Sequence, residues 1–167
     1  KRFLSFGQDL LLSHIQPYWK AYAIKMSEIN AFMSYNLKNL SGPSDFSNVL
    51  VVRSPIELPA VTISDASAEG NTVSLSIDAL GAFNGSTNFD FIQMIVLSIN
   101  GKGAAVSNNV VFSTSNPLQF TVEFPAEMGI PDEQLAIFLF AFAQDPEVNT
   151  DWSQSKYVTT LDIVPAP

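Results

Sequence analysis

The chain has 167 residues, of which 47% are hydrophobic, and it carries a formal net charge of -8 at pH 7. This length and apolar content can fill the core of one ordinary domain, which excludes intrinsic disorder. The absence of cysteine excludes disulfides, thiolate catalysis and cysteine-ligated metal sites, although it does not fix the compartment.

The charges are divided unevenly along the chain. Residues 1–40 hold five cations and two carboxylates, whereas the remainder holds three cations and 14 carboxylates. An acidic surface repels phosphate backbones, so we expect no nucleic-acid partner. The longest apolar run, residues 135–143, has about half of the roughly 20 residues that a membrane-spanning helix needs, so we expect no membrane insertion. Because the chain begins with Lys1, we expect a processed or trimmed product.

Apolar residues in the first 40 positions recur at steps of three or four, which is the spacing of one helix face. This stripe consists of Leu11, Ile15, Tyr18, Tyr22, Met26, Ile29, Met33 and Leu37. Pro17 suits the first turn of a new helix because proline lacks an N–H group. The spacing therefore predicts two helices, over roughly 2–13 and 17–37, or one kinked rod.

A proline-rich connector follows the helical segment. Gly42, Pro43, Pro55 and Pro59 interrupt residues 41–59, so this segment is unsuited to a central strand. Residues 49–53 remain apolar enough for a short edge strand.

From residue 60 onward, strand patterns alternate with turn residues at regular spacing. The predicted strands cover 60–64, 72–78, 91–99, 106–113, 117–124, 134–143 and 154–164. Seven short strands are typical of an immunoglobulin-like or fibronectin-III-like sandwich. We therefore expect an α+β fold in which an N-terminal helical segment (1–40) and a connector (41–59) precede a seven-stranded, mostly antiparallel sandwich (60–167).

Two of these strands, 91–99 and 134–143, are apolar on both faces. In the second, Leu135, Ile137 and Leu139 share one face and Phe138, Phe140 and Phe142 share the other. The sandwich topology makes these strands neighbours in one sheet, whose outer face then needs a cover. We expect the helical segment to supply it through Met26, Ile29 and Met33, with an oligomer interface as the alternative.

Motifs in and after the helical segment are similar to those of a known protein family. It contains PYWKAYA at 17–23 and FMSYNLKN at 32–39, and VLVVRS follows at 49–54. With the β-rich remainder, these residues resemble an uncharacterised family of Bacteroidota proteins classed as a domain of unknown function. The resemblance implies a helical front end, an Ig-like sandwich and a bacterial source, and it brings no catalytic residues. Members of that family usually carry a Gly-rich N-terminal extension ahead of this helix.

No residue pattern in the chain favours catalysis. His14 is the only histidine, and no G-x-S-x-G nucleophile motif accompanies it. A small sandwich without large insertions also offers no cleft for the facing carboxylates of a glycosidase. We expect His14 to have no chemical role, the protein not to be an enzyme, and no cofactor to be bound.

Two loops are the candidate binding surface. In an Ig-like sandwich the connections over 79–90 and 144–153 emerge at the same end. Their aromatic and amide side chains have the composition used in sugar or peptide recognition. The candidate ligand-binding residues are Phe83, Asn84, Asn88, Phe89, Asn149 and Trp152. The structural alternative is that the aromatic rings are buried for packing and that Trp152 caps the core.

The second of these loops is acidic. Asp145, Glu147 and Asp151 could supply carboxylate oxygens to calcium, although their spacing differs from that of an EF-hand loop. An acidic loop without a ligand is the simpler interpretation.

The functional expectation is a non-catalytic structural or protein-interaction module of a bacterial assembly, which could be surface-bound, secreted or phage-like. A protein partner or self-association is expected. The alternative is a glycan- or peptide-binding module that uses the 79–90 and 144–153 loops.

Overall fold

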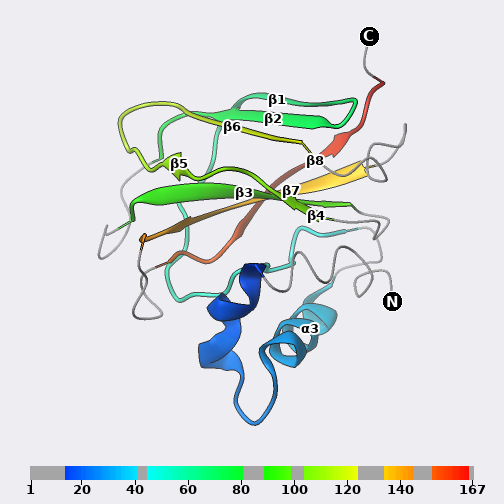
Figure 1. Cartoon of the computed structure of the whole chain (residues 1–167), viewed down its shortest axis with the longest axis vertical. Coiled ribbons are helices and arrows are strands. Elements are labelled where there is room, and N and C mark those ends of the chain that lie inside the picture. Colours follow the sequence, from blue (N-terminus) through cyan, green and yellow to red (C-terminus); the bar gives the residue numbers. More distant parts are fainter. Residues whose placement is uncertain are drawn as a thin grey trace.

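The computed structural model describes residues 14–40, 45–80, 89–98, 104–123, 134–144 and 152–165. Figure 1 shows three layers: a three-stranded sheet, a five-stranded sheet and a pair of short helices. The helices are η1, a 3₁₀-helix over Gln16–Tyr22, and α3, an α-helix over Glu28–Asn39. The strands are β1 (Ile63–Glu69), β2 (Thr72–Ile77), β3 (Phe91–Ser98), β4 (Ala104–Val106), β5 (Val110–Val111), β6 (Leu118–Glu123), β7 (Gln134–Phe142) and β8 (Lys156–Asp162).

The two sheets form a sandwich-like arrangement of antiparallel strands. The smaller sheet has the order β1-β2-β6, and the larger has the order β4-β3-β7-β8 with β5 also paired to β3. Every pairing between these strands is antiparallel. The expected α+β fold with a mostly antiparallel sandwich is therefore confirmed.

The predicted strand 106–113 is divided into β4 and β5. At the division, the N–H of Ser107 donates to the carbonyl of Met94, and the N–H of Met94 donates to the Ser107 hydroxyl, each at 2.9 Å. A side-chain oxygen thus replaces a backbone oxygen in the ladder, which interrupts regular pairing. The first predicted strand is also displaced, because β1 starts at Ile63 and continues to Glu69.

The two strands that are apolar on both faces, β3 and β7, are neighbours in one sheet, as predicted. β3 pairs with β7 over its whole length, from Phe91 opposite Phe142 to Ser98 opposite Leu135. Leu135, Ile137 and Leu139 join the core between the two sheets. Phe138, Phe140 and Phe142 join a second cluster on the outer face of the larger sheet.

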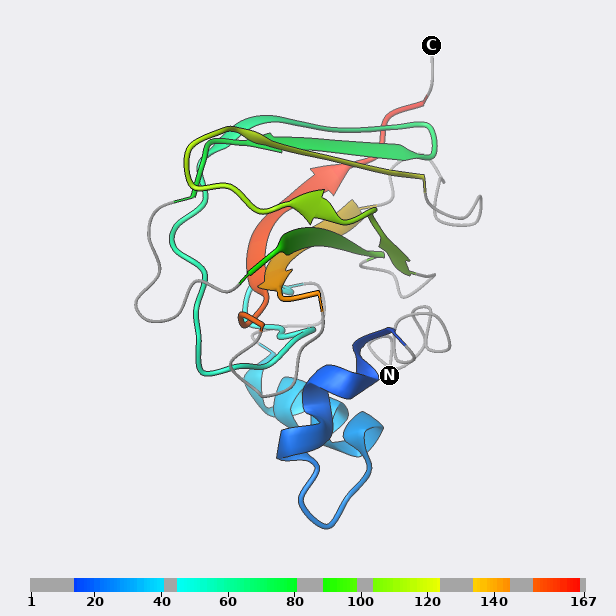
Figure 2. The same ribbon diagram turned by 60° about the vertical axis from the view of Figure 1, so that its left-hand side comes forward.

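The cover of this outer face differs in detail from the prediction. Ile15, Trp19 and Phe32 supply the helical part of the second cluster, and the 46–52 segment of the connector supplies the rest. Figure 2 shows the connector passing between the helices and the larger sheet. Residues 49–52 are therefore a buried intermediate layer, and the short edge strand expected over 49–53 does not form.

The predicted continuous helix over 17–37 is wrong, because the chain turns between η1 and α3. Lys25 in this turn has a left-handed φ of 58°, and the Ser27 hydroxyl caps α3 by accepting from the N–H of Asn30. The turn shifts the helical phase, so Met26 is 45% exposed and Ile29 is 40% exposed. The expectation that these two residues pack on the sheet is also wrong, while Met33 packs partly on the second cluster. The predicted helix over 2–13 lies outside the described residues.

Side chains form hydrogen bonds with backbone groups of the buried connector. The Asn36 amide donates to the carbonyl of Leu50 at 2.8 Å and accepts from its N–H at 2.7 Å. The Ser155 hydroxyl accepts from the N–H groups of Val51 and Val52, and the Trp19 indole N–H donates to the carbonyl of Val51 at 3.0 Å. These contacts replace the strand ladder that the connector lacks.

We predict that Phe140→Ala lowers the free energy of unfolding by about 3–5 kcal/mol, because it empties the space of a fully buried ring. Urea unfolding followed by circular dichroism measures this loss. The control is Val111→Ala, which truncates a 70% exposed side chain and should change stability by less than about 0.5 kcal/mol. A loss below about 1 kcal/mol for Phe140→Ala would contradict the burial of its ring.

We further predict that Asn36→Ala is destabilising because it leaves the buried N–H and carbonyl of Leu50 without their partners. Each unpaired group is expected to cost about 1–3 kcal/mol in unfolding free energy. The matched control is Asn39→Ala, whose amide makes one exposed hydrogen bond to the carbonyl of Tyr35. Equal losses for the two variants would show that Asn36 does not hold the connector in place.

Candidate functional site

The described ends of the two predicted binding loops lie together. The N–H of Asp90 donates to the carbonyl of Phe142, and the N–H of Gln144 donates to the Asp90 carboxylate, each at 3.0 Å. The predicted residues Phe83, Asn84, Asn88 and Asn149 lie outside the described residues, so their role in binding stays a prediction.

Trp152 and Phe89 are both buried, and they lie on opposite faces of the larger sheet. Trp152 is 7% exposed, and its indole N–H donates to the carbonyl of Arg53 at 3.0 Å. Phe89 is also 7% exposed, but it belongs to the core between the sheets, whereas Trp152 belongs to the cluster on the outer face. The larger sheet separates the two rings, and the burial of Trp152 matches the structural alternative in which it packs on the core.

The predicted calcium ligands Asp145, Glu147 and Asp151 also lie outside the described residues, and calcium binding by them stays a prediction. Within the described ranges, no group of three or more His, Asp and Glu side chains is placed to hold a metal ion.

His14 connects the start of the helical pair to the larger sheet. Its Nε2 atom lies 2.8 Å from the Oε1 atom of Gln93, a buried residue of β3. The Gln93 amide nitrogen donates to the Ser107 carbonyl and to the Asn109 side chain, each at 3.0 Å. Its oxygen therefore faces His14, and Nε2 of His14 is the donor. The sequence pattern does not predict this contact, because Gln93 lies in an otherwise apolar strand, 79 residues away from His14.

Aromatic rings join the helices to the connector and the larger sheet. The guanidinium carbon of Arg53 lies 4.2 Å from the ring centroid of Tyr22 and 4.5 Å from that of Tyr35, one ring from each helix. The ring of Tyr18 packs edge-on against Phe140 and Trp152, with centroids 5.2 and 5.1 Å apart. Burial raises the pKa of the Tyr18 hydroxyl, because the phenolate would lose its hydration.

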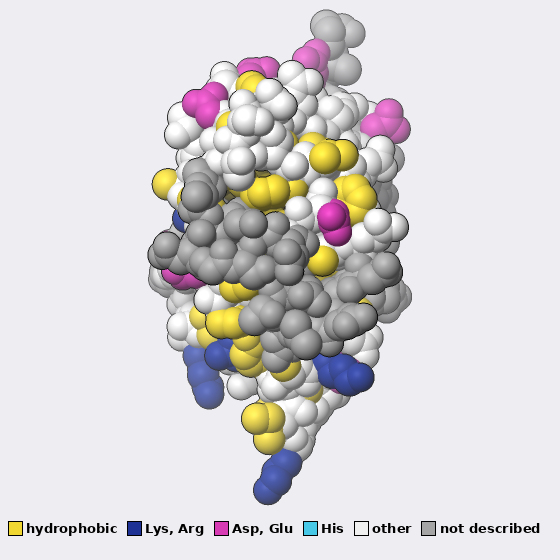
Figure 3. All heavy atoms as spheres, turned by 90° about the vertical axis from the view of Figure 1, so that its left-hand side faces the viewer, with side chains coloured by type: hydrophobic (Ala, Val, Ile, Leu, Met, Phe, Trp, Pro, Cys, Tyr) yellow, Lys and Arg dark blue, Asp and Glu magenta, His cyan; other side chains and the backbone are white. Residues whose placement is uncertain are grey.

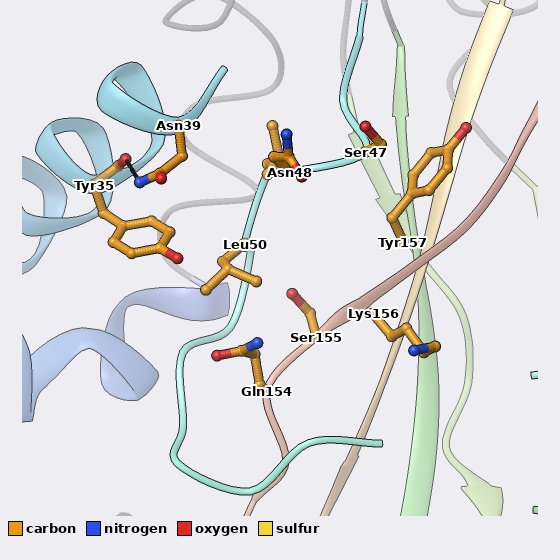
Figure 4. A pocket seen from close by; sticks show the side chains of 10 residues that line it. Tyr35, Asn39, Ser47, Asn48, Leu50, Gln154, Ser155, Lys156 and Tyr157 are labelled. Atoms are coloured by element: carbon orange, nitrogen blue, oxygen red, sulfur yellow. Dashed lines mark hydrogen bonds between the residues drawn. The ribbon is translucent and has the colours of Figure 1, made fainter. Parts of the chain in front are cut away.

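A polar groove of about 340 Å³ lies between α3, the connector and β8. Figure 4 shows Tyr35 and Tyr157 on either side of Leu50, with Asn39 and Asn48 above it and Gln154 below. Ser47, Ser155 and Lys156 also line the groove, and none of the described residues that line it is acidic. Sequence reasoning could not find this site, because its walls come from three separate parts of the chain.

The loop at the edge of this groove is fixed by a local turn. The Asp45 carboxylate accepts from both the hydroxyl and the N–H of Ser47, at 2.6 and 3.0 Å. These hydrogen bonds, the side-chain one first, lower the pKa of the exposed Asp45 carboxyl by stabilising its charged form.

The turn between the helices presents an apolar and basic surface, which we call the helical tip. It consists of Ile24, Met26 and Ile29, which are 72%, 45% and 40% exposed, together with Lys20 and Lys25. Figure 3 shows Lys and Arg gathered toward the helical end of one face, with Asp and Glu predominating toward the other end. On this face, the charge asymmetry of the sequence is an asymmetry along the long axis of the molecule.

None of the helices among the described residues has the length and apolar character needed to cross a membrane. The comparison with curated proteins found no match. The family comparison matches residues 3–158, nearly the whole chain, to a family of unknown function, DUF6266. This match confirms the expectation of an uncharacterised domain: the chain belongs to the DUF6266 family.

Proposed function

We propose that this protein is a non-catalytic structural module that associates with further copies of itself, head to tail. The observation that carries the proposal is the helical tip, where three exposed apolar side chains stand beside Lys20 and Lys25. Exposed apolar side chains grouped in this way are typical of interaction surfaces. The opposite face of α3 is not available for association, because Ala31, Phe32 and Asn36 are buried toward the connector.

The far end of the molecule carries the complementary charge. Glu69 and Glu123 both flank Thr72 in the register of the smaller sheet. Glu69 also forms a bridge with Val164, whose side chain is half exposed, and Asp162 lies two residues before it. We call Glu69, Glu123, Asp162 and Val164 the acidic end. It offers carboxylates to the two lysines of a tip and an apolar side chain to its isoleucines.

This pairing joins two different surfaces of the same chain. Such a heterologous contact leaves one tip and one acidic end free in every dimer, so it extends into a chain of copies. The lysine–carboxylate contacts are exposed to solvent, so added salt weakens them.

We also propose that the protein is not an enzyme, that its sandwich is of the Ig or fibronectin-III type, and that it comes from a member of the Bacteroidota. The absence of catalysis is supported by His14, whose Nε2 atom is engaged by an amide and not by a nucleophile. An Ig or fibronectin-III type is supported by the strand orders β1-β2-β6 and β4-β3-β7-β8, which correspond to A-B-E and C′-C-F-G. The FMSYNLKN motif supports a Bacteroidota source.

Sedimentation velocity of the purified protein tests the proposed association. We expect the mean sedimentation coefficient to rise with protein concentration at low salt and to fall when salt is added, because the lysine–carboxylate contacts are screened. Lys25→Glu at the tip and Glu69→Lys at the acidic end should each reduce association. An equimolar mixture of the two variants should restore it, because each then meets an opposite charge.

The control is Lys156→Glu, which makes the same charge change on β8, away from both surfaces. This variant should associate like the unaltered protein. A monomer at every concentration in low salt contradicts the proposal, as does equal loss of association in Lys25→Glu and Lys156→Glu.

A further inference from the structure

We infer that the groove between α3, the connector and β8 is a binding site for a saccharide unit. The buried apolar residues Val49 and Leu50 form part of its lining, and the half-buried rings of Tyr35 and Tyr157 stand on either side of Leu50 (Figure 4). Its volume of about 340 Å³ lies at the lower end of the range for small-molecule sites, which fits a ligand of one or two rings.

The groove is held in shape before any ligand arrives. The Asn36 amide holds Leu50 through both of its backbone groups, and the Ser155 hydroxyl holds the N–H groups of Val51 and Val52. The Asp45 carboxylate holds Ser47 at the edge. A site whose backbone is already fixed loses little conformational freedom when a ligand binds.

Several polar groups in the groove are available to a ligand. Among the described residues, the Tyr35 hydroxyl, the Gln154 side-chain amide and the Lys156 ammonium make no hydrogen bond or ion pair. The Asn39 side chain uses its nitrogen on the carbonyl of Tyr35, which leaves its oxygen as an acceptor. The groove therefore offers both donors and acceptors.

This combination selects the chemical class of the ligand. Amide and hydroxyl groups that both donate and accept complement the hydroxyl groups of a sugar, and the half-buried tyrosine rings add apolar surface beside them. The described lining residues are too polar for a lipid chain, and none of them carries a carboxylate that could neutralise an amine. Among the described lining residues, Lys156 alone is charged, which suits a neutral sugar or a single carboxylate better than a polyphosphate.

The test is a titration of the ¹⁵N-labelled protein, followed by amide chemical shifts in NMR. The probes are N-acetylglucosamine, galactose and glucuronate, and glycerol is the control for a polyol without a ring. We expect saturable shifts at Asn39, Leu50 and Gln154 with at least one sugar and none with glycerol. Preference for glucuronate over the neutral sugars would assign a carboxylate-binding role to Lys156.

Two variants locate the binding. Gln154→Ala and Tyr35→Phe should each weaken the affinity for the bound sugar by about tenfold, the loss of one hydrogen bond to the ligand. The matched control is Gln119→Ala on the exposed face of β6, which should bind like the unaltered protein. If Gln154→Ala fails to fold, Tyr35→Phe removes only a hydroxyl and still decides the question.

The inference is overturned if no sugar gives saturable shifts in the groove, or if both variants bind as tightly as the Gln119→Ala control. It is independent of the proposed self-association, because Lys25→Glu alters only the helical tip and should leave the sugar-induced shifts unchanged.

Discussion

Apolar residues on both faces of β3 and β7 impose the arrangement of the whole molecule. A strand pair with one apolar face needs a single partner layer, whereas this pair needs two. The smaller sheet covers Leu135, Ile137 and Leu139, and the helices with the connector cover Phe138 and Phe140. The helical segment is therefore part of the folded core and not an appendage, and the sandwich would expose a large apolar surface without it.

Burying the connector creates a second requirement, because its backbone lies between two layers and belongs to neither sheet. The protein meets this requirement with side chains from both layers: Asn36 and Trp19 from the helices, and Ser155 beside β8. No buried side-chain nitrogen or oxygen among the described residues lacks a hydrogen-bond partner. The same contacts that stabilise the cover also fix the walls of the polar groove, so the candidate site is a consequence of how the core is completed.

The sequence allowed the sheets to be predicted better than their cover. Alternation along 134–143 reports side-chain direction directly, because successive strand residues point to opposite faces. The helical spacing gave a wrong prediction for the burial of Met26 and Ile29. The turn near Lys25 changes which residues share a helix face, and no glycine or proline in the sequence marks that turn. The connector and the groove could not be foreseen, because Asn36, Leu50 and Ser155 meet only in three dimensions. Trp152 shows a related limit, since composition alone does not distinguish an exposed aromatic ring from a buried one.

α3 shows how one short element can serve three surfaces. Residues four apart lie on the same side of a helix, so Phe32 and Asn36 face the connector while Tyr35 and Asn39 line the groove. Ile29 and Leu37 take a third direction and remain exposed. Because Ile29 and Leu37 belong to neither of the other two sets, a change at this exposed face can alter association without disturbing the fold or the groove. A change at Asn36 acts differently, since it removes the contact that fixes Leu50 and so affects the core and the groove together.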